Sequence, residues 1–81
     1  MKKNNETFSD RLYMLRKKEL ALKQEAFARM LGLHPITISY YKNNERRPNL
    51  VFFQKIKKKW QVNLNWLISG QGDMFDQKGE K

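Results

Sequence analysis

The feature that most constrains the fold of this chain is a set of small, flexible and apolar residues at fixed spacing within residues 24–43. Two short helices that cross steeply over a tight turn must approach closely, so the crossing needs a small residue, and Ala28 provides it. Gly32 provides a turn residue that adopts positive φ without steric cost. Ile38 and Tyr41 share a helical face and give the second helix an apolar inner side. This spacing predicts two helices joined by a tight turn.

Apolar residues at helical spacing predict further helices on both sides of this pair. We expect helices over residues 9–19, from about residue 24 to Gly32, from Pro35 to a polar loop at 43–49, from Asn49 through Trp60, and over residues 64–69. Ser9 and Asn49 are expected to cap the first and the fourth helix, and Gly70 to end the last. No repeat and no alternating strand pattern is present, so the sequence predicts an all-α domain. After Gly70 we expect a loose tail in which Met74 and Phe75 can still pack.

The chain is strongly basic, because 17 Lys and Arg against 8 Asp and Glu give it a net charge of +9 over 81 residues. Such a charge attracts polyanions, with nucleic acid first and an anionic membrane surface second. The sequence has no cysteine, which excludes disulfides, thiolate zinc sites and cysteine nucleophiles and is consistent with a cytoplasmic location. No apolar run approaches the roughly 20 residues of a membrane-spanning helix, so no membrane protein is expected.

Residues that could carry catalysis or bind a metal are scarce. His34 is the only histidine, and a single histidine cannot build a metal site or a catalytic triad on its own. The aspartates lack a catalytic spacing, and the glycines near residue 70 do not form a phosphate-binding loop. We therefore expect no enzyme activity, no metal and no cofactor. His34 directly precedes Pro35 and is expected to cap the helix there or to lie near a phosphate.

Motifs along most of the chain resemble one family. They are Leu12-x-x-Leu15-Arg16, Leu22-Lys23-Gln24-Glu25-x-Phe27-Ala28, Leu31-Gly32-Leu33, Ile38-Ser39, Arg47-Pro48 and Val62-Asn63-Leu64-Asn65-Trp66-Leu67-Ile68-Ser69-Gly70-Gln71-Gly72. In these residues the chain resembles the lambda-repressor-like and Cro-like helix-turn-helix domains of phage and bacterial regulators. The resemblance implies a compact five-helix domain over residues 8–75, with a disordered arm at 1–7 and a disordered tail at 76–81. It also implies a repressor-like transcriptional regulator that binds double-stranded DNA sequence-specifically, with the helix around residues 35–43 in the major groove.

The resemblance places the base-reading side chains at Pro35, Ile36, Ser39 and Tyr40. This set contains no Gln, Asn or Arg for a bidentate contact to adenine or guanine. We expect Ile36 to pack on a thymine methyl group, and Ser39 and Tyr40 to form one hydrogen bond each. The apolar character of Ile36 and Tyr40 leaves a second interpretation open, in which this face binds a protein such as a toxin partner.

Contacts to the phosphate backbone are expected on both sides of the reading helix. Gln24 is assigned by the resemblance, and a helix dipole assists an anion at that helix start. The full set of expected phosphate-binding residues is Lys23, Gln24, Thr37, Asn43, Arg46 and Arg47. Such contacts fix the register of a protein on DNA without reading the sequence.

Three positions depart from the family pattern. Lys42 stands where many members carry a glutamate that pairs with the arginine matching Arg16. Either this ion pair is missing or another acid, such as Glu45, completes it. Asn44 stands where glycine is usual, and asparagine also adopts the left-handed conformation. His34 stands where Ser or Thr is common.

The last helix bears on assembly. Trp66, Leu67 and Ile68 offer more apolar surface than one small core absorbs, and related domains often dimerise in this region, so we expect a homodimer through the C-terminal helix. In the competing interpretation Trp66 and Leu67 simply close the core. An RNA-binding or membrane-surface protein would use the same charge, but RNA binding favours aromatic residues on a sheet or loop, and no sheet is expected here.

Overall fold

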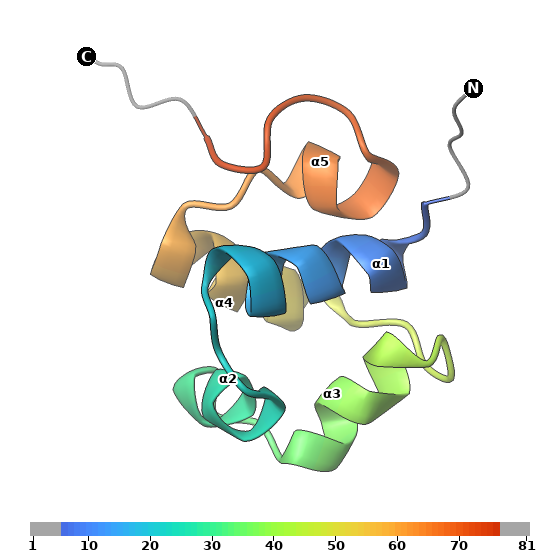
Figure 1. Ribbon diagram of the computed structural model, residues 1–81, viewed down its shortest axis with the longest axis vertical. Helices are drawn as coiled ribbons and strands as arrows, with labels where there is room; N and C mark the ends of the chain where they lie inside the picture. The colour runs from blue at the N-terminus through green and yellow to red at the C-terminus, as the bar shows by residue number, and fades with distance from the viewer. Residues whose placement is uncertain (1–5, 77–81) are drawn as a thin grey trace.

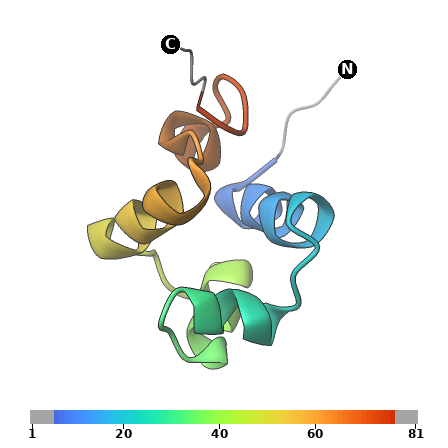
Figure 2. The same cartoon turned by 90° about the vertical axis from the view of Figure 1, so that its left-hand side faces the viewer.

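Helical segments follow one another along residues 6–76, the part of the chain that the structure, a computed structural model, describes. They are α1 (Phe8–Tyr13), η1 (Met14–Glu19), α2 (Gln24–Met30), α3 (Pro35–Lys42), α4 (Leu50–Trp60) and α5 (Leu64–Ser69). Since α1 and η1 run on as one first helix, the all-α fold of five helices is confirmed. In Figure 1 the first helix lies between α5 on one side and the α2–α3 pair on the other. Figure 2 shows α1 and α4 standing side by side above that pair.

Thr7 caps the first helix, and the predicted cap at Ser9 is wrong. The hydroxyl of Thr7 accepts from the amide of Asp10 at 3.2 Å, and the carboxylate of Asp10 accepts from the amide of Thr7 at 3.0 Å. This reciprocal pair is a capping box. Ser9 is buried, and its hydroxyl donates to the carbonyl groups of Tyr41 and Lys42 at the end of α3. A hydroxyl that is turned towards α3 cannot also cap its own helix.

The second half of the first helix is wound more widely than an α-helix. The amide of Leu20 donates to the carbonyl of Leu15 at 2.9 Å, which is the bond of a π-helix. The amide of Leu22 then donates to the carbonyl of Arg16 at 2.9 Å, across Ala21 at φ 54°. The helix reaches residue 19 as predicted, but apolar spacing gave no sign of the wider winding.

One cluster of buried apolar side chains fills the space between the helices. Its members are Leu12, Leu15, Phe27, Ala28, Leu31, Ile38, Tyr41, Phe52, Ile56, Val62, Trp66 and Leu67. The ring of Phe27 stacks on Trp60 with centroids 5.3 Å apart. The ring of Tyr41 meets Phe52 edge-on at 4.8 Å. Because aromatic pairs add about 0.5–1.5 kcal/mol beyond burial, these two fix α2 and α3 against α4.

A buried arginine joins α1 to α5. Arg11 is 6% exposed, and its guanidinium donates to the carbonyl groups of Leu67 and Ile68 at 2.9 Å each. These carbonyls lie in the last turn of α5, where no further helical amide is available to bond them. Arg11 therefore satisfies the end of a helix that lies far from it along the chain.

Beyond α5 the chain returns alongside the connection between α4 and α5. The amide of Asn63 donates to the carbonyl of Met74 at 2.9 Å, and the amide of Asp76 donates to that of Gln61 at 2.8 Å. Met74 and Phe75 pack against the core, as predicted. A single bridge pairs Val62 with Phe75, and residues 6–76 form no strand.

Three residues that the sequence assigned to the arm and the tail are bonded to the domain. Glu6 pairs with Arg11 at 3.4 Å, Thr7 caps α1, and Asp76 pairs with Lys57 at 2.6 Å. The other residues of the predicted arm and tail, 1–5 and 77–81, lie outside the described residues.

Over residues 6–76, Arg16 is satisfied by the backbone and forms no ion pair with an acidic side chain. Its guanidinium donates to the carbonyl of Leu22 at 2.7 Å and lies over the ring of Tyr13 at 5.5 Å. Among the described residues no ion pair joins Arg16 to Glu45, so the alternative in which Glu45 replaces the missing glutamate is wrong. The turn after η1 places the carbonyl of Leu22 beside Arg16, and this carbonyl accepts the hydrogen bond that a carboxylate would otherwise accept.

Candidate nucleic-acid interface

The junction between α2 and α3 is tight because the residues that meet there are small or left-handed. Ala28 is fully buried, and its methyl group lies within the core. Gly32 has φ 72°, a conformation that costs glycine nothing sterically. The amide of Leu33 donates to the carbonyl of Ala28 at 2.9 Å, which closes the end of α2. The turn therefore directs α3 across α2 with little freedom.

The helix α3 turns one face to the core and another to solvent. Ile38 and Tyr41 are 1% and 9% exposed and belong to the core cluster. The four side chains expected to read bases lie outside that buried face: Ile36 is 47% exposed, and Pro35, Ser39 and Tyr40 are half-buried. The core thus sets the rotation of α3 and leaves these four accessible.

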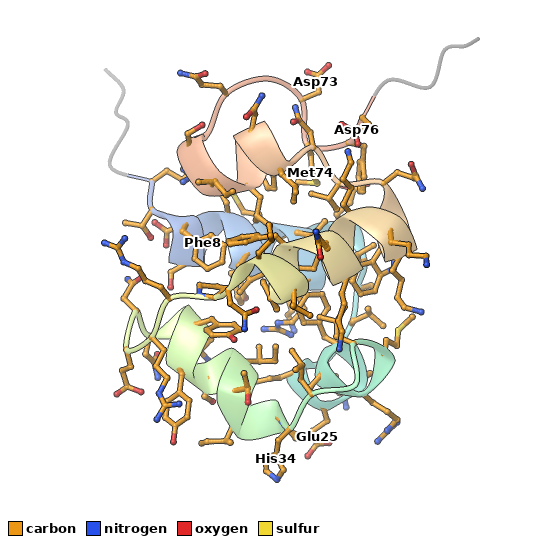
Figure 3. All side chains as sticks on the ribbon, turned by 180° about the vertical axis from the view of Figure 1, so that it is seen from behind. Phe8, Glu25, His34, Asp73, Met74 and Asp76 are labelled. Carbon is orange, nitrogen blue, oxygen red and sulfur yellow. The ribbon has the colours of Figure 1, made fainter. Side chains whose placement is uncertain are left out.

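The start of α3 lies at the edge of the molecule. The Nδ1 atom of His34 accepts from the amide of Ile36 at 3.2 Å, so His34 caps the helix as predicted. Figure 3 shows His34 beside Glu25, at the end of the molecule opposite to Met74 and Asp73. The start of α3 is consequently remote from the last residues of the described chain (Figure 3).

Gln24 joins the start of α2 to α3. Its amide nitrogen donates to the hydroxyl oxygen of Ser39 at 2.9 Å and to the carbonyl of Pro35 at 3.2 Å. Both protons of the amide are used in this way, and only its carbonyl oxygen is left, which is an acceptor. Phosphate oxygens are acceptors as well. A contact between the Gln24 side-chain amide and a phosphate therefore requires the amide to release one of these two bonds.

The loop after α3 folds back onto the reading helix. Asn44 has φ 62°, so it adopts the left-handed conformation predicted for it. The amides of Glu45 and Arg46 both donate to the carbonyl of Tyr40, at 2.8 and 3.4 Å. The guanidinium of Arg46 then lies over the Tyr40 ring, 4.5 Å from its centroid. A residue expected to bind phosphate thus contacts one expected to read a base.

The remaining residues expected to bind phosphate surround α3. They are the exposed Lys23, Asn43 and Arg47 and the half-buried Thr37. Lys23 precedes α2 and Asn43 follows α3, so polar groups are available on both sides of the reading face. Over residues 6–76, no helix is long and apolar enough to cross a bilayer. The same part of the chain holds no group of three or more side chains suited to a metal ion.

Sequence reasoning named Ser9 only as a helix cap and missed its contact with the end of α3. Its hydroxyl bonds to the carbonyls of Tyr41 and Lys42 and holds the end of α3 against α1. The only sequence signal was a serine on the core side of the first helix, three residues before Leu12. Helical spacing could not identify its partners, which lie more than 30 positions further along the chain.

Comparison with known proteins identifies the family. The helix-turn-helix family model matches residues 12–67, which is more than half of the chain. The crystal structure of the P22 c2 repressor protein in complex with synthetic operator 9T in the presence of Tl+ is similar, with a TM-score of 0.69 and 26% sequence identity. The match covers 80% of this chain and 97% of that chain. Curated protein sequences gave no significant match. Because the family model covers the whole α2–α3 pair and the repressor structure is similar, the chain belongs to the lambda-repressor-like helix-turn-helix family.

Proposed function

We propose that this chain is a repressor-like transcriptional regulator that binds double-stranded DNA sequence-specifically, with α3 in the major groove. The observation that carries the proposal is the outer face of α3, whose side chains the core leaves accessible between polar and cationic flanks. The major groove of B-DNA is wide enough to admit an α-helix. The similarity to a repressor bound to an operator supports the same mode of binding.

Base reading would rest on three accessible side chains. Ile36 is exposed and suits a thymine methyl group, and the hydroxyl of Tyr40 suits one hydrogen bond. Ser39 already accepts a bond from Gln24, so its own hydroxyl proton is free to donate. Ser39 would therefore favour an acceptor in the groove, which guanine, adenine and thymine each present.

Selection of bound duplexes from a random pool tests the proposal and yields the preferred site. The net charge of +9 predicts a steep salt dependence, because cations that meet phosphates release condensed counterions. On the selected duplex, we expect affinity to fall more than about tenfold between about 50 and 200 mM salt. A pool without enrichment would contradict sequence-specific binding, and a smaller drop would contradict a complex held mainly by contacts to the DNA backbone.

Variants separate base reading from backbone contact. Ile36→Ala and Tyr40→Ala should cost about 1–3 kcal/mol on the selected duplex and much less on a scrambled one. Asn43→Ala and Arg47→Ala should weaken both duplexes alike, because phosphates carry no sequence. Gln24→Ala should weaken both duplexes and also lower the preference for the selected one, since Gln24 holds Ser39 through a hydrogen bond. If the Ile36 and Tyr40 variants keep the parental ratio of affinities, α3 does not read the groove with this face.

Assembly as a homodimer forms part of the proposal. Trp66 and Leu67 are 8% and 0% exposed, so these two close the core, whereas Ile68 is 52% exposed. Ile68 lines a groove of about 480 Å³ together with Phe8, Phe53 and residues of the loop after α3. A second copy seated here would cover apolar surface that the single domain leaves in water.

The stoichiometry of the complex tests the dimer. Two copies on a palindromic duplex would place their reading helices one turn apart, roughly 34 Å. Sedimentation should give two protomers per duplex for the parent and a weaker second binding step for Ile68→Glu. One protomer per duplex at saturation would overturn the dimer. Loss of a captured protein partner by Ile36→Ala, with DNA binding unchanged, would favour a protein-interaction module instead.

A further inference from the structure

Tyr40 of the reading helix and Arg46 of the loop after it form a cation–π pair. The guanidinium carbon of Arg46 lies 4.5 Å from the centroid of the Tyr40 ring. This is within the roughly 6 Å over which a cation and an aromatic face attract each other. Arginine suits such a contact better than lysine because its guanidinium is planar and stacks on rings. Arg46 covers one face of the Tyr40 ring, so the other face and the hydroxyl are the parts left to contact DNA.

The helix α3 and the loop that follows it bring Tyr40 and Arg46 together. Tyr41 packs edge-on against Phe52 at 4.8 Å, which fixes the rotation of α3 and leaves the neighbouring Tyr40 half-buried at the margin of the core. Asn44, at φ 62°, reverses the chain after the helix. The amide of Arg46 then shares the carbonyl of Tyr40 with the amide of the preceding residue. Tyr40 consequently anchors the loop through its backbone and receives the Arg46 side chain on its ring.

We infer that Arg46 is a positioning residue that holds the Tyr40 ring ready to read a base, and that it thereby contributes to sequence preference. A half-buried tyrosine without such a contact can sample more than one staggered rotamer, and binding must immobilise one of them. Stacking by Arg46 removes part of that cost before DNA arrives. The guanidinium carries five N–H donors, so some of them can still meet a phosphate while its carbon lies over the ring. The inference rests on the proposed reading role of α3.

A double-mutant cycle on two duplexes tests the inference. The four proteins are the parent, Arg46→Ala, Tyr40→Ala and the double variant, each measured on the selected and on a scrambled duplex at one salt concentration. Arg46→Ala should lower the ratio of the two affinities about two- to fivefold, the factor that corresponds to an exposed cation–π contact. In the Tyr40→Ala background the same change should leave the ratio unaltered. Arg47→Ala serves as the matched control and should leave the ratio at the parental value.

A charge-conserving variant and a measurement without DNA distinguish positioning of the Tyr40 ring from simple attraction between Arg46 and DNA phosphates. Arg46→Lys keeps the positive charge, so it should retain affinity for the scrambled duplex while losing part of the ratio. In the free protein, NMR should show ring-current shifts on the side-chain protons of Arg46 that disappear in Tyr40→Leu. The inference is overturned if Arg46→Ala weakens both duplexes equally in both backgrounds, or if these shifts are absent.

The failure of the proposed function has a different signature. A parent protein that binds all duplexes alike would overturn base reading by α3, and with it the role of Arg46 in sequence preference. A parent that discriminates between duplexes while Arg46→Ala keeps the full ratio would overturn the role of Arg46 alone.

Discussion

Two helix junctions of this domain are closed by different kinds of contact. At the turn where α2 meets α3, the fully buried Ala28 and the left-handed Gly32 allow close approach, and the packing around Ala28 is apolar. Where α1 meets α5, Arg11 donates to the carbonyls of Leu67 and Ile68 at 2.9 Å each. The first junction depends on volume and the second on hydrogen bonds.

The difference decides which substitutions each junction tolerates. A close-packed apolar contact responds to any added atom or charge, because cores contain little unused space. A buried polar contact responds to the loss of one partner, because the groups left behind stay without a hydrogen bond. The junction that orients the reading helix should thus be sensitive to enlargement, and the one that orients α5 to deletion of a donor.

The largest effect is expected at the apolar junction. Ala28→Glu places a charge where only a methyl group fits, and we expect a loss of about 3–5 kcal/mol, the scale for an uncompensated buried charge. Met30→Glu is the matched control on the same helix, since Met30 is 43% exposed. Thermal unfolding of both variants measures the contrast. If Ala28→Glu melts within a few degrees of the parent, Ala28 does not lie at the crossing.

An intermediate effect is expected at the polar junction. Arg11→Met keeps much of the side-chain volume but removes the donors to Leu67 and Ile68, which should cost about 1.5–3 kcal/mol, as for hydrogen bonds to charged groups. Arg29→Met, at an exposed position, is the control. In Arg11→Met, amide hydrogen exchange should accelerate relative to the parent in α5 and much less in α3. Equal acceleration in both helices would mean that Arg11 supports the whole domain and not this junction.

The smallest effect is expected at the start of α1, next to the polar junction. Thr7→Ala removes the cap and should destabilise the domain by about 1 kcal/mol. Thr7→Ser keeps a hydroxyl and should remain near the parent. Hydrogen exchange at the first amides of α1 reports the cap directly. Should Ser9→Ala release these amides while Thr7→Ala does not, the cap lies at Ser9 after all.

Local sequence patterns were sufficient for the positions of the helices along the chain and for the rotation of α3, but not for the cap or the π-helical winding of the first helix. The inward positions of Ile38 and Tyr41, the left-handed Gly32 and Asn44, and the cap at Asn49 all follow from residue type and spacing. Each of them depends on neighbours within one or two helical turns. Such short-range preferences are written in the sequence itself, which is why the family could be identified from it.

The polar contacts around the reading helix were decided by the tertiary structure alone. Ser9 reaches the end of α3, Gln24 reaches Ser39, and Arg46 covers Tyr40. Each bond depends on where the loops place one element against another, and a serine, glutamine or arginine has many other partners that its local sequence would equally allow. Hydrophobic spacing reports which face of a helix is buried, but a directional hydrogen bond exists only once both partners have been brought to within about 3 Å of each other.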